Sequence, residues 1–280
     1  MADATTTSSP FPHNLRHNGS VSRIRIHITT PHAPVHNLGT LSFLPPELVA
    51  LLLPHLDLLT LSRLRRVNRF ALLTINHHPV FALLLHCHPT ILRAIFATRA
   101  SRFITLLSLS SALATTSCAT HACDRAAAYL YLPLCHRACG SCIGSSPAYQ
   151  PLGLITASRS YGLPTQIVEG LPHLFSVPGR YGPRGRYEGR VTRLVDVRSV
   201  EERAAEYHGS LARARRFGGM ERGLRMRVEE VYAGEEGEGR RWMGVCWVGI
   251  PGGEDGDLRT LGMEEGAVEE VDGRVGAIGV

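Results

Sequence analysis

Residues 44–70 read LPPELVALLLPHLDLLTLSRLRRVNRF, and this stretch decides the fold of the N-terminal part of the chain. Leucines recur at helical spacing from Leu48 to Leu56, and a second apolar series runs from Leu61 to Val67. The pattern predicts two short amphipathic helices separated by a polar break. A unit this short cannot bury all of its leucines against itself, so it needs a partner surface.

The boundaries of the two helices follow from individual residues. Pro45 and Pro46 suit the first turn of a helix, where a missing N–H costs nothing. Asp57, just before the second series, is a natural N-cap. Pro54 lies inside the first series, where proline removes a backbone donor and clashes with the preceding turn. We therefore expect the first helix to be shortened or kinked near Leu53.

Within this stretch the key positions follow one order: Leu44, Pro45, Glu47, Leu48, Leu51, Leu52, Leu56, Asp57, Leu58, Leu61, Leu64, Val67, Asn68 and Phe70. This order resembles the F-box, a helical motif that docks substrate receptors onto the Skp-type adaptor of cullin–RING ubiquitin ligases. The resemblance implies that Leu44, Pro45, Leu48, Leu56, Leu61, Leu64, Val67 and Phe70 contribute to the adaptor-binding face. The alternative is a leucine-rich helical hairpin that serves as an internal core.

Five of the seven cysteines lie between residues 118 and 142, a clustering that indicates metal binding rather than disulfides in an intracellular protein. Cys139 and Cys142 form a C-x-x-C knuckle, the spacing that lets two thiolates reach one tetrahedral zinc ion. The candidate ligands are Cys118, Cys123, Cys139 and Cys142, with Cys135 and His121 as alternatives. Two interpretations stay open: a closed, structural zinc site, or a patch of free thiols.

Several segments beyond the F-box-like stretch share a further pattern: Tyr129–Pro133, the cluster of Cys135, Arg137, Cys139 and Cys142, then Leu171-Pro172, Ser176–Gly179 and residues 194–210. This pattern is similar to a class of filamentous-fungal F-box proteins, and the resemblance covers residues 44–216. The chain departs from the class at Ala138, where a cysteine is expected, and in the wide spacing of its first cysteine pair. It also lacks the cysteine-containing stretch expected after Trp247.

The chain divides by composition into four regions. We expect a disordered tail at 1–40, the F-box and its helical extension at 41–113, a cysteine-rich substrate-recognition region at 114–250, and an acidic, glycine-rich disordered tail at 251–280. Residues 191–217 start like a strand and end like a charged helix, and residues 242–250 have the pattern of a strand. The expected fold class is mainly α with minor β (α+β), with zinc stabilising the middle region where it binds.

Motif content narrows the function classes. No G-x-S-x-G elbow, Walker loop or H-E-x-x-H motif is present, so an enzyme is the least supported class. The resemblance to the F-box implies a non-catalytic subunit of a ubiquitin ligase. Its partners would be the Skp-type adaptor, through it the cullin–RING assembly, and a protein substrate that the sequence does not identify. No apolar span reaches membrane length and no secretory signal is evident, so we expect a cytoplasmic or nuclear protein that does not enter a membrane.

The charge is unevenly distributed along the chain. Arginine exceeds the acidic residues by 7 in residues 1–120 and by 8 in residues 121–227, whereas the acidic residues exceed arginine by 9 in residues 228–280. A zinc-knuckle protein that binds nucleic acid is therefore an alternative, although scattered arginines on solvated surfaces explain the excess more simply. A second alternative is an F-box protein that acts outside a ligase. All 30 basic residues are arginine, because the chain contains no lysine.

Overall fold

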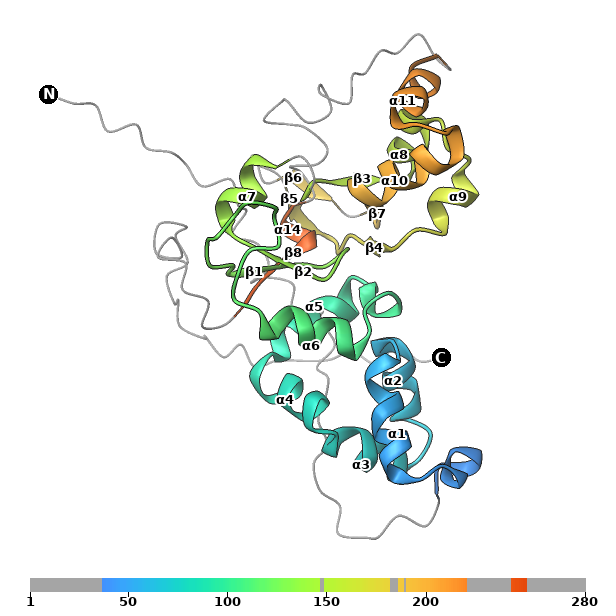
Figure 1. Cartoon of the computed structure of the whole chain (residues 1–280), viewed down its shortest axis with the longest axis vertical. Helices are drawn as coiled ribbons and strands as arrows, with labels where there is room; N and C mark the ends of the chain where they lie inside the picture. The colour runs from blue at the N-terminus through green and yellow to red at the C-terminus, as the bar shows by residue number, and fades with distance from the viewer. Residues whose placement is uncertain (1–36, 147–148, 182–185, 189, 221–242, 251–280) are drawn as a thin grey trace, which may run out of the picture.

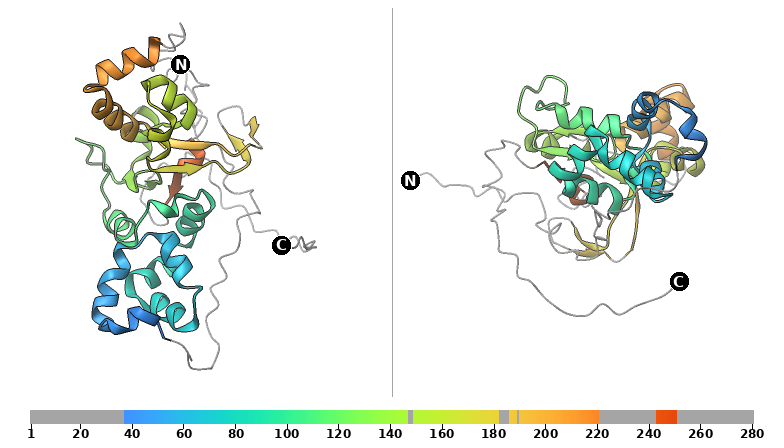
Figure 2. Two further views of the ribbon diagram at one scale, coloured as in Figure 1. Left: turned by 90° about the vertical axis from the view of Figure 1, so that its right-hand side faces the viewer. Right: turned by 90° about the horizontal axis from the view of Figure 1, so that it is seen from below.

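The structure, a computed structural model, describes residues 37–146, 149–181, 186–188, 190–220 and 243–250. The described part is mainly helical with small antiparallel sheets, which confirms the predicted fold class. The helices of residues 46–114 lie at one end of the molecule and those of residues 154–220 at the other, with sheets between them (Figure 1 and Figure 2). The two expected tails lie outside the described residues, except for residues 37–40, which lead into the 3-10 helix η2 (Gly39–Phe43).

The F-box-like stretch forms short helices with the predicted breaks. They are α1 (Pro46–Leu52), the 3-10 helix η3 (Leu53–His55), α2 (Leu58–Leu64) and the start of α3 (Arg69–His77). α1 ends two residues before Pro54, which cannot donate the next helical hydrogen bond. The carboxylate of Asp57 caps α2 by accepting the backbone N–H of Thr60 at 2.9 Å. The expected cap and the expected break are both confirmed.

The helical part continues through α4 (Pro79–Cys87), α5 (Pro89–Ala97), the 3-10 helix η4 (Ala100–Arg102) and α6 (Leu106–Ala114). Proline opens α4 and α5, where its missing N–H costs no helical bond. Thr105 caps α6 in a reciprocal arrangement with Ser108. Among the described residues no single helix is long and apolar enough to cross a bilayer, although α3 and α4, bent by 79° at their junction, meet that test as a pair.

The strands are short and pair antiparallel. One sheet has the order β2-β1-β8, formed by β1 (Tyr129–Tyr131), β2 (His136–Ala138) and β8 (Trp247–Gly249). A second has the order β3-β7-β4, formed by β3 (Pro151–Gly153), β7 (Arg193–Asp196) and β4 (His173–Phe175), while β5 (Gly179–Tyr181) and β6 (Arg186–Glu188) form a hairpin. The remaining helices are α7 (Gly140–Ser145), α8 (Leu154–Tyr161), α9 (Thr165–Glu169), α10 (Val197–His208), α11 (Leu211–Met220) and α14 (Met243–Cys246).

Two expectations for the C-terminal half have different outcomes. The predicted strand followed by a charged helix is confirmed by β7 and α10. The strand expected at 242–250 is shorter, because Met243–Cys246 is a helical turn and residue 242 lies outside the described residues. β8 pairs with β1 from Tyr131 opposite Trp247 to Tyr129 opposite Gly249, and backbone hydrogen bonds from Leu132 to Cys246 and from Ile250 to Ala128 flank these pairs.

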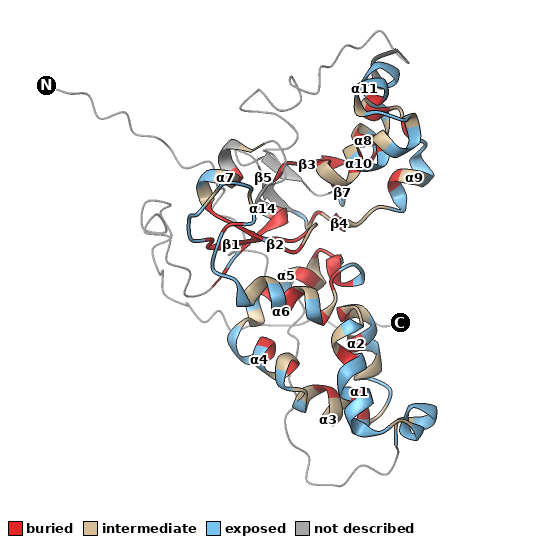
Figure 3. Ribbon diagram, in the orientation of Figure 1, coloured by how far each residue is buried: buried red, intermediate tan, exposed pale blue. Residues whose placement is uncertain are grey.

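Two groups of buried side chains hold the described part together. The larger runs from Val49 in α1 to Ile250 after β8, and it joins the F-box-like helices to the cysteine-rich region. The smaller runs from Leu152 to Ala214 and lies among β3, β7 and the helices α8 to α11. Figure 3 marks these buried positions in red. Because the larger core crosses residue 113, the helical part and the β2-β1-β8 sheet form one packed unit.

Candidate functional site

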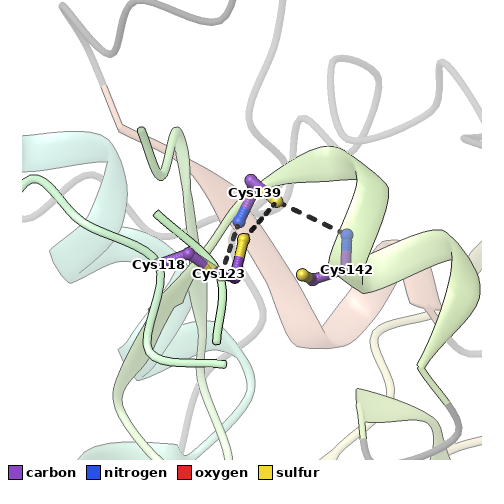
Figure 4. A group of neighbouring side chains, drawn as sticks. All are labelled: Cys118, Cys123, Cys139 and Cys142. Carbon is purple, nitrogen blue, oxygen red and sulfur yellow. Dashed lines mark hydrogen bonds between the residues drawn. The ribbon is translucent and has the colours of Figure 1, made fainter. Parts of the chain in front are cut away.

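Four cysteines come together beside the β2-β1-β8 sheet (Figure 4). Cys118 and Cys123 lie in the loop after α6, and Cys139 and Cys142 lie at the start of α7. Their sulfur atoms all lie within 4.8 Å of one another, and the Sγ atoms of Cys123 and Cys139 are 3.8 Å apart. Four thiolates bound about 2.3 Å from one tetrahedral ion lie about 3.8 Å apart. The group can therefore hold a metal ion.

The first turn of α7 explains the C-x-x-C pair. Cys139 is the N-cap residue, and its sulfur accepts the backbone N–H of Cys142 at 3.5 Å. The backbone N–H of Cys139 in turn donates to the sulfur of Cys118 at 3.4 Å. Hydrogen bonds of this kind favour the charged form of the acceptor, which is the thiolate that a metal ion needs.

Cys118 and Cys123, the more widely spaced pair, come close together because the chain between them reverses its direction. Ala122, next to Cys123, adopts the left-handed backbone conformation with φ of 60°, which turns the chain back on itself. On either side of this turn, Ser117 and Ala126 form an antiparallel bridge. We call residues 116–127 the metal loop. Its closed shape brings Cys118 and Cys123 to one centre despite their C-x4-C spacing.

The thiols of this group differ in their ionisation. Burial opposes ionisation of Cys118, but hydrogen bonds with Thr120 and with the backbone of Cys139 outweigh it and lower the pKa of Cys118 to about 7. Burial raises the pKa of Cys139 to about 12, and it also raises the pKa of Cys142. All seven cysteines of the chain are free of disulfides. The lowered pKa favours the thiolate of Cys118, whereas a bound cation would have to offset the raised pKa values of Cys139 and Cys142.

The two alternative ligands lie apart from the four sulfur atoms. Cys135 is buried, and burial raises the pKa of its thiol to about 12 although a hydrogen bond with Ser108 of α6 opposes the rise. His121 is exposed in the metal loop. Neither belongs to the ligand group found among the described residues. The structure brings together the four cysteines named first as candidate ligands and leaves out both alternatives.

The second candidate site is an apolar surface on the F-box-like helices. Its members are the six most exposed large side chains on η2, on α1 and around the start of α3: Phe43, Leu48, Leu51, Leu52, Val67 and Phe70. We call these six residues the leucine face. Phe43 is 89% exposed, Leu51 66% and Val67 69%. Figure 3 shows η2 and most of α1 in the colour of exposed residues.

The predicted adaptor-binding residues divide between this face and the core. Leu48, Val67 and Phe70 are on the leucine face, and Pro45 is exposed beside it. Leu44, Leu56 and Leu64 are half-buried and pack against the larger core, and Leu61 is fully buried within it. Leu61 therefore packs inside the core beneath the leucine face and cannot contact a partner.

Sequence reasoning left three members out of the adaptor-binding set: Phe43, Leu51 and Leu52. For Leu51 and Leu52 the reason lies in the packing of this segment, in which α1 buries Val49 and η3, one turn later, buries Leu53. Residues four apart share a side of a helix, so the leucines between them face outward. Periodicity marks the apolar positions of α1, but only packing decides which of them face the core.

Side-chain hydrogen bonds join the elements that carry the leucine face. The amide of Asn68, which caps α3, donates to the carbonyl of Asn37 at 2.7 Å and so holds the segment before η2 against α3. The ring Nε2 of His78, at the start of α4, lies 3.2 Å from the carbonyl oxygen of Ala50 in α1. Because these contacts connect the elements, the exposed residues are held in a defined arrangement.

Comparison of the chain with models of protein families, with curated proteins and with solved structures found no match. The assignment of both sites therefore rests on the residues of this chain and on their geometry.

Proposed function

We propose that this protein is a substrate-receptor subunit of a Skp–cullin–F-box ubiquitin ligase and that the leucine face binds the Skp-type adaptor. The observation that carries the proposal is the exposure of six large apolar side chains on joined, adjacent elements. Soluble proteins rarely leave an extensive apolar patch uncovered unless a partner covers it. Each leucine or phenylalanine that becomes fully buried contributes up to about 1.5–3 kcal/mol to association.

The charge around the leucine face indicates the chemistry of its partner. Residues 37–114 contain seven arginines but only two acidic residues, Glu47 and Asp57. Arg63 and Arg66 are exposed near Val67, and no ion pair holds either of them within the described ranges. A partner with an apolar groove and an acidic rim fits this surface, and such a rim speeds association at low salt.

The proposed receptor acts by tethering and carries out no bond-forming step itself. Binding one region to the adaptor and another to a substrate raises the effective concentration of the substrate near the loaded ubiquitin. The described residues beyond α6, which include the smaller core, are the candidates for substrate recognition. The catalytic groups belong to the ligase partners under this proposal.

We also propose that the ion held by the four cysteines is zinc. Four thiolates in a tetrahedral set are typical of structural zinc sites, and a site with four protein ligands leaves no position open for a substrate. When bound, zinc would supply a cross-link between the metal loop and α7. Cys118, Cys123, Cys139 and Cys142 would hold it, and its role would be to stabilise the region that follows the F-box-like helices.

A pull-down with the full-length chain tests the proposed function. The chain is immobilised and offered purified Skp-type adaptor with its cullin–RING partner. Retention of both supports the ligase role, whereas retention of the adaptor without the cullin favours an F-box protein acting outside a ligase. Failure to retain either one, together with binding to single-stranded nucleic acid that weakens steeply with salt, would support the zinc-knuckle alternative instead.

A further inference from the structure

Arg137 is a buried cation that is held by backbone carbonyls. It lies in the middle of β2, and the residue is 7% exposed. Its Nε and Nη2 donate to the carbonyl of Ala127 at 3.0 and 2.6 Å. Its Nη1 donates to the carbonyl of Leu113 at 3.3 Å and also to that of Thr115. In the described residues no carboxylate pairs with it, so these three carbonyls compensate its charge.

Two of the three carbonyls belong to the end of a helix. Leu113 lies in the last turn of α6, and Thr115 is its C-cap residue. The last carbonyls of a helix have no partner within the helix, and the negative end of the helix dipole favours a cation there. Arg137 therefore supplies the cap that α6 lacks from its own backbone.

The third carbonyl belongs to the metal loop. Ala127 donates its own N–H to Thr116 at 2.8 Å, which closes the base of the loop. The carbonyl of Arg137 also accepts the N–H of Ala119, next to Cys118, at 2.8 Å. Arg137 thus holds the metal loop through both its side chain and its backbone. Because Cys139 follows two residues later, the same residue sets the position of one ligand pair relative to the other.

The far end of α6 is attached to the F-box-like helices. The N–H of Leu106 donates to the carbonyl of Leu56 at 3.2 Å, and the N–H of Leu58 donates to the carbonyl of Ile104 at 3.0 Å. A nine-residue helix is about 13 Å long. α6 therefore connects the start of α2 with Arg137 and the metal loop through an unbroken series of hydrogen bonds.

We infer that Arg137 is a positioning residue that shapes the metal loop for the ion and couples metal binding to α6, and so to the helices that carry the leucine face. The inference rests on the proposed metal site. Metal binding orders the loop, the ordered loop holds the guanidinium, and the guanidinium holds the end of α6. By linkage, a stable α6 in turn favours metal binding. Lysine cannot replace arginine here, because a single ammonium cannot reach three carbonyls in this fork-shaped arrangement.

Zinc affinity of the full-length chain, measured by competition with a chromophoric chelator, tests the positioning role. We expect Arg137→Met and Arg137→Lys to bind zinc about tenfold or more weakly, the size of effect seen when groups outside the ligand set are lost. The control is Arg125→Met, which removes an exposed arginine from the same loop. It should stay within about twofold of the unsubstituted chain. Equal affinity for Arg137→Lys and Arg125→Met would overturn the inference.

Hydrogen exchange tests the coupling, and its decisive comparison uses only the unsubstituted chain with and without zinc. We expect added zinc to slow exchange in the unsubstituted chain both in the metal loop and at the last turn of α6. In Arg137→Lys zinc should protect the loop but no longer α6. Protection confined to the loop in the unsubstituted chain would overturn the coupling while leaving the metal site intact. If that chain takes up no zinc at all, the metal site and the inference both fail.

Discussion

The hydroxyl of Tyr131 donates a 3.0 Å hydrogen bond to the Oδ1 atom of Asp196, and this bond joins the two packing cores. Tyr131 belongs to the larger core, where its ring contacts Tyr149 and Trp247. Asp196 ends β7, and its other oxygen caps α10 by accepting the N–H of Ser199 at 2.9 Å. The fully buried carboxylate of Asp196 therefore accepts hydrogen bonds from Tyr131 in the larger core and from the first turn of α10, which packs in the smaller core.

Tyr131→Phe removes this hydrogen bond and keeps the ring contacts. Since the acceptor is a buried carboxylate, we expect a loss of about 1.5–3 kcal/mol in the free energy of unfolding. Urea denaturation of the full-length chain measures it. Tyr207→Phe is the matched control, because Tyr207 is 54% exposed and its substitution should change stability by less than about 0.5 kcal/mol. Equal stability of the two variants would show that the bond contributes nothing.

The ionisation of Asp196 should also make the free energy of unfolding depend on pH. Burial raises the pKa of this carboxyl, although hydrogen bonds from Ser199 and Tyr131 oppose the rise. A folded-state pKa above the unfolded value of about 3.9 means that the folded state binds the proton more tightly. The contribution of Asp196 to stability is therefore greatest below the unfolded pKa and falls as the pH rises through the folded-state pKa.

Asp196→Asn tests this dependence because its amide does not titrate, while its oxygen can accept the N–H of Ser199 and its NH2 group can donate to the Tyr131 hydroxyl. Urea denaturation at a series of pH values upward from about 4 should show the unsubstituted chain losing stability relative to the variant as the pH rises. The difference between the two proteins isolates this carboxyl from the other acidic groups. A difference that stays constant across the series would contradict the expected titration.

Removal of the proposed zinc ion should destabilise the cysteine-rich region more than the smaller core. The four cysteines join the metal loop to α7, whereas the smaller core contains none of them. A chelator should lower the melting temperature of the unsubstituted chain, and Cys142→Ser should melt at the chelated value with or without chelator. Cys87→Ser is the control, since Cys87 is exposed on α4 and lies outside the ligand group. An unchanged melting temperature after chelation would argue against a structural ion.

The absence of lysine makes a separate prediction about the proposed ligase. Ubiquitin is normally attached through an amine, and this chain offers only its α-amino group. In a reconstituted ligase, acetylation of that group should abolish modification of the receptor through amines while a bound substrate is still modified. Mass spectrometry of the receptor band gives the answer, and extensive modification after acetylation would refute the expectation.

The sequence predicts the local structure of this protein better than its long-range contacts. Helix breaks at Pro54 and the cap at Asp57 depend on neighbouring residues only, and both are confirmed. The pairing of β8 with β1 joins segments more than one hundred residues apart, and no local pattern identifies it. The inward orientation of Val49 rather than Leu48 likewise depends on the core that forms around α1.

At the metal site, too, the sequence predicts the local part and not the long-range contacts. Spacing identifies Cys139 and Cys142 as a ligand pair because one helical turn is enough to bring them together. The choice of Cys123 over Cys135 depends on the left-handed turn at Ala122, which spacing does not encode. The role of Arg137 was not predicted, because its partners are backbone carbonyls of two segments that meet only in the folded chain.

Calorimetric titration of the full-length chain with the Skp-type adaptor tests most directly whether the leucine face binds the adaptor. We predict a one-to-one complex, with Leu51→Glu binding at least about thirtyfold more weakly, equivalent to about 2 kcal/mol. Ile155→Glu should bind like the unsubstituted chain, because Ile155 is similarly exposed, at 59%, but lies on α8 at the opposite end of the molecule. No complex with the unsubstituted chain, or equal affinity of the two glutamate variants, would contradict the assignment of the leucine face.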